Sequence, residues 1–131
     1  MIGEVWDIDS FLKEMPIKPT ESYKLGDEYV LSNQKLRHRI ETVWNLTIEH
    51  KTVHDHHYEE IYHPIFKALD QQAKTIIKYK ELYNLTCLIS IRCDYHKVQT
   101  PGIRLDSSII NFVVPYGYVV CSGKSSVIGN F

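Results

Sequence analysis

Hydrophobic and polar positions alternate most regularly over residues 85–95, where every odd-numbered residue is apolar and most even-numbered residues are polar. This period of two predicts a β-strand with one buried and one solvated face, which is typical of an antiparallel sheet. After a Thr100-Pro101-Gly102 turn, apolar residues return at helical spacing over residues 105–114, and a second strand then runs to Cys121. The candidate N-terminal caps of this helix are Asp106 and Ser107.

Residues 7–15 predict a short amphipathic helix that Pro16 ends. Its N-terminal cap is Asp7 or Asp9, because a carboxylate in that position accepts a hydrogen bond from a free backbone N–H group. The apolar stripe that this helix turns toward the core consists of Ile8, Phe11, Leu12 and Met15.

Two strands are predicted before residue 50. A Gly26-Asp27 turn closes an irregular segment and leads into a short edge strand over residues 29–31. Residues 40–49 form a longer strand, whose mostly apolar face consists of Ile40, Thr42, Trp44, Leu46 and Ile48. Because Trp44 shares the face of the aliphatic residues, we expect it in the core.

A helical pattern covers residues 58–83 and breaks near residues 69–72. Pro64 either kinks the first helix or lies in the first turn of a helix that starts near His63. Helices and alternating strands in this order predict an α+β fold in a single domain, residues 1–131. We expect a mainly antiparallel sheet of about four to five strands, covered by about three to four helices.

The chain of 131 residues has a formal net charge of −1. Proteins that bind nucleic acid usually carry a basic excess, so this balance argues against nucleic acid as a partner. The local basic run over residues 35–39 is interpreted as the solvated rim of a hairpin. No apolar window has the length needed to cross a bilayer, and no secretory signal is visible, so we expect a cytoplasmic protein without a membrane partner.

The cysteines and the one Gly-Lys-Ser sequence give no catalytic signature. Cys87 and Cys93 lie on the same face of the predicted strand, about 20 Å apart, which is too far for a disulfide. Buried, reduced thiols are the expected state, and burial raises the pKa of a thiol. Gly123-Lys124-Ser125 lacks the upstream glycine of a phosphate-binding loop, so we expect neither catalytic residues nor a cofactor.

Histidines crowd into one segment of the chain, at positions His50, His54, His56, His57 and His63. On a helix, His56 would share a face with Glu60, and Glu59 with His63, a geometry that a metal ion can use. The spacing matches no zinc motif, so the interpretation is a solvated loop and first helical turn without a metal.

Aromatic residues give a different indication, because nine tyrosines and two tryptophans are many for this length. Both residue types are favoured where one end of the side chain is packed and the other is wet, as at protein–protein interfaces. A local acidic and aromatic patch supplies the candidate partner-binding residues. They are Asp55, Tyr58, Glu59, Glu60 and Tyr62.

Several short motifs follow one another along the chain: Gly3-Glu4, Ile17-Lys18-Pro19-Thr20, Gly26-Asp27, Trp44 and Thr100-Pro101-Gly102. Their order resembles an uncharacterised bacterial family that is catalogued as a domain of unknown function. The resemblance runs from Gly3 to Val120 and implies an α+β domain without established catalytic residues. It also implies a strand before Gly3-Glu4. Because the sequence starts at Met1, we expect that strand to be absent, shortened or lost to a late start codon, and its loss would leave a sheet edge unpaired.

These observations lead to the hypothesis of a non-enzymatic protein-binding domain, specifically a bacterial immunity protein that binds and neutralises a toxin. Such inhibitors occlude an active site with aromatic anchors and a charged rim. Two alternatives stay open. One is a small metal- or ligand-binding enzyme that uses the segment from His50 to His63, and the other is a structural or regulatory module that self-associates through a sheet edge.

Overall fold

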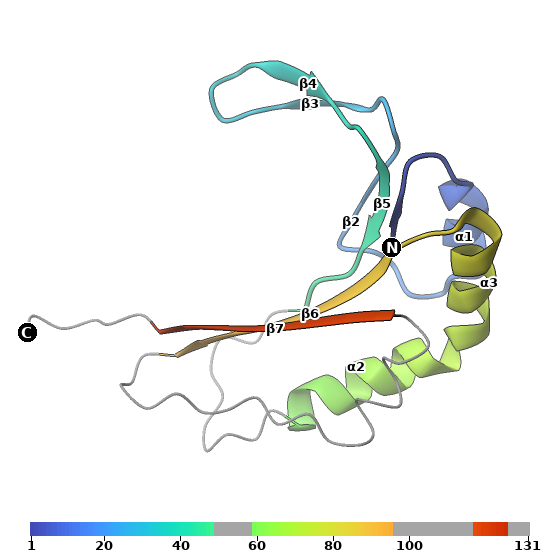
Figure 1. Cartoon of the computed structure of the whole chain (residues 1–131), viewed down its shortest axis with the longest axis vertical. Helices are drawn as coiled ribbons and strands as arrows, with labels where there is room; N and C mark the ends of the chain where they lie inside the picture. The colour runs from blue at the N-terminus through green and yellow to red at the C-terminus, as the bar shows by residue number, and fades with distance from the viewer. Residues whose placement is uncertain (49–58, 96–116, 126–131) are drawn as a thin grey trace, which may run out of the picture.

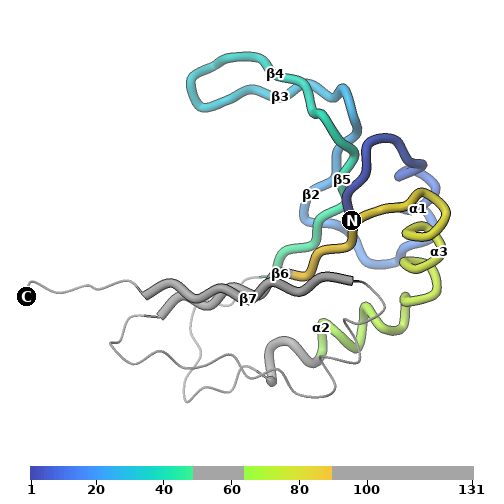
Figure 2. The backbone as a smooth tube through the Cα atoms, viewed as in Figure 1, coloured from blue at the N-terminus to red at the C-terminus, as the bar shows by residue number. Residues whose placement is uncertain are grey.

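The computed structural model describes residues 1–48, 59–95 and 117–125, which contain three helices and seven strands (Figure 1). Figure 2 traces the backbone in the same view. The first sheet has the order β1-β5-β2, formed by Ile2–Gly3, Thr42–Asn45 and Glu21–Tyr23. The second pairs β3 (Glu28–Val30) with β4 (Leu36–His38), and the third pairs β6 (Cys87–Tyr95) with β7 (Gly117–Ser125). The helices are α1 (Ile8–Glu14), α2 (Glu59–Gln71) and α3 (Ala73–Tyr83). These elements confirm the α+β fold.

The core is an aromatic cluster at the junction of α1, α3 and β5. Phe11 of α1 is completely buried, and its ring centroid lies 5.6, 5.6 and 5.1 Å from those of Trp6, Trp44 and Tyr79. All three neighbours meet Phe11 edge to face, the arrangement that aromatic quadrupoles favour. The predicted stripe of α1 and the predicted core position of Trp44 are therefore confirmed.

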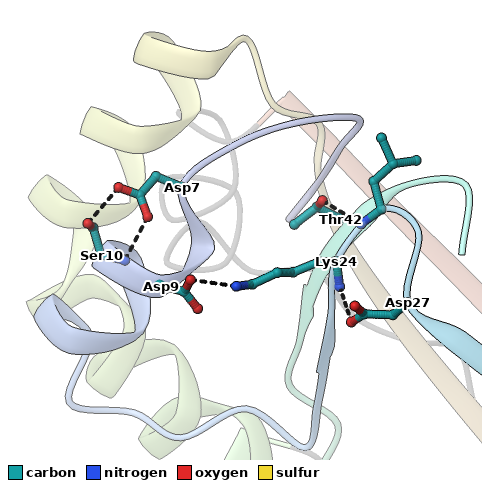
Figure 3. Close-up of polar contacts among 7 residues, drawn as sticks. Asp7, Asp9, Ser10, Lys24, Asp27 and Thr42 are labelled. Atoms are coloured by element: carbon teal, nitrogen blue, oxygen red, sulfur yellow. Dashed lines mark hydrogen bonds and ion pairs between the residues drawn. The ribbon is translucent and has the colours of Figure 1, made fainter.

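Asp7 is the N-terminal cap of α1, which decides between the two predicted carboxylates. Its Oδ1 accepts a hydrogen bond from the Ser10 backbone N–H at 3.0 Å, and its Oδ2 accepts one from the Ser10 hydroxyl at 2.6 Å (Figure 3). The hydroxyl bond, more than the backbone bond, holds the pKa of Asp7 below its ordinary value. The negative charge also lies at the positive end of the helix dipole.

The predicted break in the long helical segment is confirmed, because α2 ends at Gln71 and α3 begins at Ala73. Pro64 lies inside α2, which begins at Glu59, so the predicted placement in a first turn near His63 is wrong. A proline at this depth has no N–H for the carbonyl four residues earlier. The C-terminal cap of α3 is Asn84, whose left-handed backbone (φ 51°) is tolerated by asparagine.

The pairing of β6 corrects the expectation drawn from its alternation. β6 pairs with β7 in parallel, in a register that places Ile91 opposite Cys121, whereas the sequence predicted an antiparallel partner. A parallel pair needs a crossover of a dozen or more residues, and the chain between Tyr95 and Gly117 has that length. The helix predicted over residues 105–114 lies outside the described residues. Gly123-Lys124-Ser125 lies at the end of a strand.

β5 is shorter and more deeply buried than the alternating pattern predicted. Val43 and Trp44 are both buried although they point to opposite faces of the sheet, so β5 is covered on both faces. Ile40, predicted on the buried face, is 81% exposed. It precedes the strand in a bend, so the alternation of β5 does not extend to it.

Where the family resemblance implied a strand before Gly3-Glu4, the structure has the short strand β1, Ile2–Gly3. It pairs with β5 on one side, and on the other Ile2 exchanges two backbone hydrogen bonds of 2.9 Å with Thr86. The implied unpaired edge is therefore covered. A Cβ at Gly3 would lie 2.5 Å from Cδ2 of Leu85, so a larger residue there would force the Leu85 side chain to shift.

Strands β2, β3, β4 and β5 form one long hairpin with an interruption in its middle. The register pairs Tyr23 with Val43 in the lower half and Glu28 with His38 in the upper half, and the same offset holds in both ladders. The lower half belongs to the three-stranded sheet, whereas the upper half extends away from the helices (Figure 1). This upper half positions the candidate site.

Candidate functional site

The upper half of the hairpin, residues 28–38, is a projecting two-stranded arm (Figure 1). At its tip the Leu31 N–H donates to the Lys35 carbonyl at 3.0 Å, which leaves a three-residue loop. Gln34 ends that loop in the left-handed region (φ 62°), and Asn33 accepts the Lys35 N–H through its side chain at 3.1 Å. Such a loop matches the twist of the flanking strands. The arm is thus a regular hairpin to its tip.

The Gly26-Asp27 pair builds the root of the arm, which comprises residues 24–27 and 39–42. Gly26 has a φ of +89°, which favours glycine, and its N–H donates to the Arg39 carbonyl at 2.8 Å. Arg39 returns a hydrogen bond of 2.8 Å to the Asp27 carbonyl. The Asp27 carboxylate accepts the Lys24 N–H at 2.8 Å, as Figure 3 shows. The predicted Gly-Asp turn is therefore confirmed, and the arm begins at this turn to project from the helices and the three-stranded sheet, which together form the body of the molecule.

Two side chains tie this root to the body (Figure 3). The Lys24 ammonium donates to Asp9 of α1 at 2.5 Å, and this hydrogen bond raises the pKa of Lys24. The buried Thr42 hydroxyl accepts the Leu25 N–H at 2.9 Å and donates to the Glu4 carbonyl at 2.9 Å. Thr42 therefore satisfies two backbone groups that the interrupted ladder leaves without strand partners.

Arg39 fixes the angle between the arm and the lower half of the hairpin. Its guanidinium carbon lies 3.9 Å from the ring centroid of Tyr23 and 4.1 Å from that of Tyr29. One ring belongs to the sheet and the other to the arm, so the cation joins the two halves across the root. Its Nη2 also lies 3.3 Å from Oε1 of Glu21. The root is held by stacking, an ion pair and backbone hydrogen bonds together.

The arm itself leaves apolar side chains in solvent. Val30 and Leu36 are opposite one another in the register and are 63% and 55% exposed. Directly opposite residues share a face, so these two form an uncovered aliphatic pair. Tyr29 and Arg37 occupy the other face, next to the stacked Arg39. The two faces therefore differ: one is aliphatic, and the other is aromatic and cationic.

The partner-binding residues predicted from the sequence belong to a different part of the chain. Asp55 and Tyr58 lie outside the described residues. Glu59, Glu60 and Tyr62 lie in the first half of α2, where the structure describes the backbone only. This patch therefore stays a prediction. In residues 1–48, 59–95 and 117–125, no group of three His, Cys, Asp or Glu residues is arranged to hold a metal ion.

The basic run over residues 35–39 was interpreted as a hairpin rim, which is confirmed: β4 lies there and its side chains are exposed, except for the half-buried Arg39. The exposed aliphatic pair of the arm, Val30 and Leu36, was missed. The sequence does contain an apolar residue in each strand of this short hairpin. However, the pattern of an alternating strand is the same whether its apolar face is covered or exposed.

A second polar cluster, between α1 and α3, is structural. The Glu14 carboxylate accepts hydrogen bonds from the Lys78 ammonium at 3.1 Å and from the Tyr79 hydroxyl at 2.9 Å. Both hydrogen bonds lower the pKa of Glu14, and the one from Lys78 has the larger effect. Burial, reinforced by Glu14, raises the pKa of Tyr79 to about 12. Cys87 is buried nearby in the core, and burial raises the pKa of its thiol.

No helix in the described part of the chain combines the length and apolar character needed to cross a membrane.

Comparison with known proteins places the chain in one family. No curated protein and no solved structure matches the sequence. The profile of a family described as "Domain of unknown function (DUF4279)" matches residues 1–118. The chain therefore belongs to this family.

Proposed function

We propose that this protein is a non-enzymatic protein-binding domain that engages its partner through the arm. The uncovered Val30–Leu36 pair is the observation that carries the proposal. A two-stranded hairpin is marginally stable alone in water, and uncovered apolar side chains rimmed by polar residues mark interaction sites. Ile40 at the root is also in solvent, with 81% of its surface exposed.

The root supports this proposal because it fixes the arm before any partner arrives. Arg39 lies between Tyr23 and Tyr29, and Lys24 and Thr42 anchor the root to α1 and to the segment after β1. A docking element that is already ordered loses less conformational entropy on binding. The arm is therefore suited to enter a concave site on another protein.

Within this class we propose a bacterial immunity protein that neutralises a toxin. A rigid, projecting hairpin that carries aliphatic and cationic faces can occlude an active-site cleft, as inhibitors of this kind do. The resemblance to a bacterial family of small, often single-domain proteins supports the same proposal. The predicted acidic and aromatic patch, from Asp55 to Tyr62, would supply a second contact region.

The test is protection of cells from the toxin encoded beside the gene, with and without a change in the arm. We expect Leu36→Asp to abolish protection and co-purification of the two proteins. Leu82→Asp is the matched control, because Leu82 of α3 is 66% exposed and belongs to another surface. Protection that survives Leu36→Asp, or that is lost equally in both variants, contradicts docking through the arm.

A further inference from the structure

We propose that the outer edge of β4 binds an extended, acidic segment of a partner protein as an added β-strand. The inference rests on the proposed function, because it takes the arm as the docking element. It adds the chemistry of the partner and the edge of the arm that is used. Three features carry it: the outward backbone groups of β4, the cations beside them, and the different charge of β3.

The backbone of β4 offers hydrogen-bonding groups to a new strand. Arg39 donates to the carbonyl of Asp27, and Leu31 donates to that of Lys35, so the inward-facing pairs of this ladder are the odd-numbered residues. In an antiparallel pair the residues between them direct N–H and C=O groups outward. Leu36 and His38 therefore present these groups along the side of β4 that pairs with no strand of the described residues. Added strands bind edges of this kind through main-chain hydrogen bonds.

The charges select an acidic segment. Four cationic side chains belong to the arm and its root, and two of them have carboxylate partners: Lys24 pairs with Asp9, and Arg39 pairs with Glu21. In the described part of the chain, neither Lys35 nor Arg37 forms such a pair, and both are exposed. These two flank Leu36 on β4. Opposite charges on neighbouring strands stabilise their pairing, whereas like charges oppose it.

The edge of β3 is different, which makes the assignment specific. Its outward-facing residues are Glu28 and Val30, the Glu28 carboxylate lies 3.4 Å from His38 across the ladder, and β3 carries no cation. An acidic strand would meet a like charge on β3 and two cations along β4. Because Leu36 and Arg37 point to opposite faces, the favoured segment alternates aliphatic residues with carboxylates.

A second copy of this chain fits the same edge poorly. Antiparallel pairing of two β4 strands would bring Lys35 and Arg37 of one copy beside those of the other. A nucleic acid would satisfy the cations, but it has no strand backbone to pair with Leu36 and His38. The combination of outward backbone groups and unpaired cations therefore favours an acidic polypeptide.

The first experiment measures fluorescence anisotropy of a labelled peptide in which Glu alternates with Val, titrated with the full chain. We expect saturable binding that weakens about tenfold or more in Arg37→Glu. Lys67→Glu, the same charge change at an exposed lysine of α2, should bind as the unsubstituted protein does. No binding, or equal weakening in both variants, would overturn the proposal.

The second experiment tests the strand edge with two prolines placed opposite one another. Leu36→Pro removes an outward N–H from β4, and Val30→Pro removes the corresponding N–H from β3. Circular dichroism verifies that both proteins are folded. Loss of peptide binding in Leu36→Pro alone supports an added strand on β4, whereas loss in Val30→Pro alone or equal loss in both overturns it.

Three further outcomes would overturn the proposal, because each would show that the edge of β4 does not select an acidic strand. They are equal binding of a peptide with Lys in place of Glu, tighter binding of a single-stranded oligonucleotide, and a dimer that Leu36→Pro dissociates. The protection assay distinguishes a failure of the added-strand proposal from a failure of the proposed function. If Leu36→Asp abolishes protection but the acidic peptide does not bind, this inference fails and the proposed function stands.

Discussion

The aromatic core and the arm use the same residue types for opposite purposes. In the core, Phe11 is completely buried and packs edge to face against Trp6, Trp44 and Tyr79. At the root of the arm, tyrosine rings instead stack on the guanidinium of Arg39, and the aliphatic residues beyond them stay in solvent. Aromatic contacts thus stabilise the fold in one region and orient an uncovered element in the other.

A single hairpin joins these two regions, so their difference does not arise from separate domains. β5 delivers Trp44 to the core, and its first residue, Thr42, anchors the root of the arm. Substitutions along this hairpin should therefore have large effects on stability at the core end and small effects at the arm. Binding should show the reverse order.

The largest loss of stability is expected from Phe11→Ala. Removing a ring that three aromatic neighbours surround leaves a cavity, and such changes cost about 3–5 kcal/mol. Urea unfolding followed by tryptophan fluorescence measures the loss. Phe11→Leu fills part of the space and should lose clearly less. A loss below about 1 kcal/mol for the alanine variant would mean that this cluster is not the main core.

Thr42→Val should give the next largest loss, because it breaks the connection between core and arm. The variant keeps the shape but leaves the Leu25 N–H and the Glu4 carbonyl without a partner. An unsatisfied buried polar group costs about 1–3 kcal/mol. Thr42→Ser keeps the hydroxyl and should retain most of the stability. Equal losses in the two variants would show that the methyl group matters more than the hydrogen bonds.

The core should also differ from the arm in its response to alkali. Burial and Glu14 raise the pKa of Tyr79 from 10.0 to about 12, so the folded state favours the neutral phenol. Its contribution to stability is complete below about pH 10 and is lost as the pH rises toward about 12. Urea unfolding across this range should show a smaller decline in Tyr79→Phe. An identical decline in both proteins would contradict the raised pKa.

Arg39→Ala should affect the arm more than the core. The stacking on two rings contributes about 1 kcal/mol, so the change in global stability is modest. Hydrogen exchange of backbone amides in β3 and β4 should accelerate, while that of α3 is unchanged. Uniform acceleration across the chain would mean that Arg39 stabilises the whole fold and does not specifically orient the arm.

The smallest change in stability is expected from the double variant Val30→Ser and Leu36→Ser. Both side chains are already in solvent, and surface substitutions of this kind stay within about 0.5 kcal/mol. Val43→Ser is the control at the core end of the hairpin, where a buried valine contributes about 1.5–3 kcal/mol. If the double variant loses as much unfolding free energy as the control, the aliphatic pair of the arm is packed in solution, and the arm does not differ from the core in burial.

Elements that depend on local patterns were predicted closely. The α1 helix was predicted with its stripe and with Asp7 as one of two caps, because a short amphipathic helix is specified by residues within two turns. The break between α2 and α3 and the turn at Gly26-Asp27 were found for the same reason. Pro64 was harder to place, since the sequence does not show where α2 begins.

Features that depend on distant residues were not predicted. β6 pairs with β7 in parallel, and the alternation of β6 carries no information about the direction of its partner strand. The burial of β5 depends on residues far away in the sequence, such as Phe11 of α1, which packs against Trp44. The candidate site escaped prediction likewise, because Leu36 has the same local pattern whether its face is covered or free.

The sequence by itself determined the helices, the turn at the root of the arm and the membership of an α+β family, since each depends on residues close together or on motifs in order. Only the tertiary structure decided which apolar residues are buried. Phe11 and Leu36 are both apolar residues of regular elements. Phe11 is surrounded by three aromatic rings, whereas Leu36 is 55% exposed to solvent. The reason is physical: burial is a property of what surrounds a side chain, and those surroundings come from segments that are far apart in the chain.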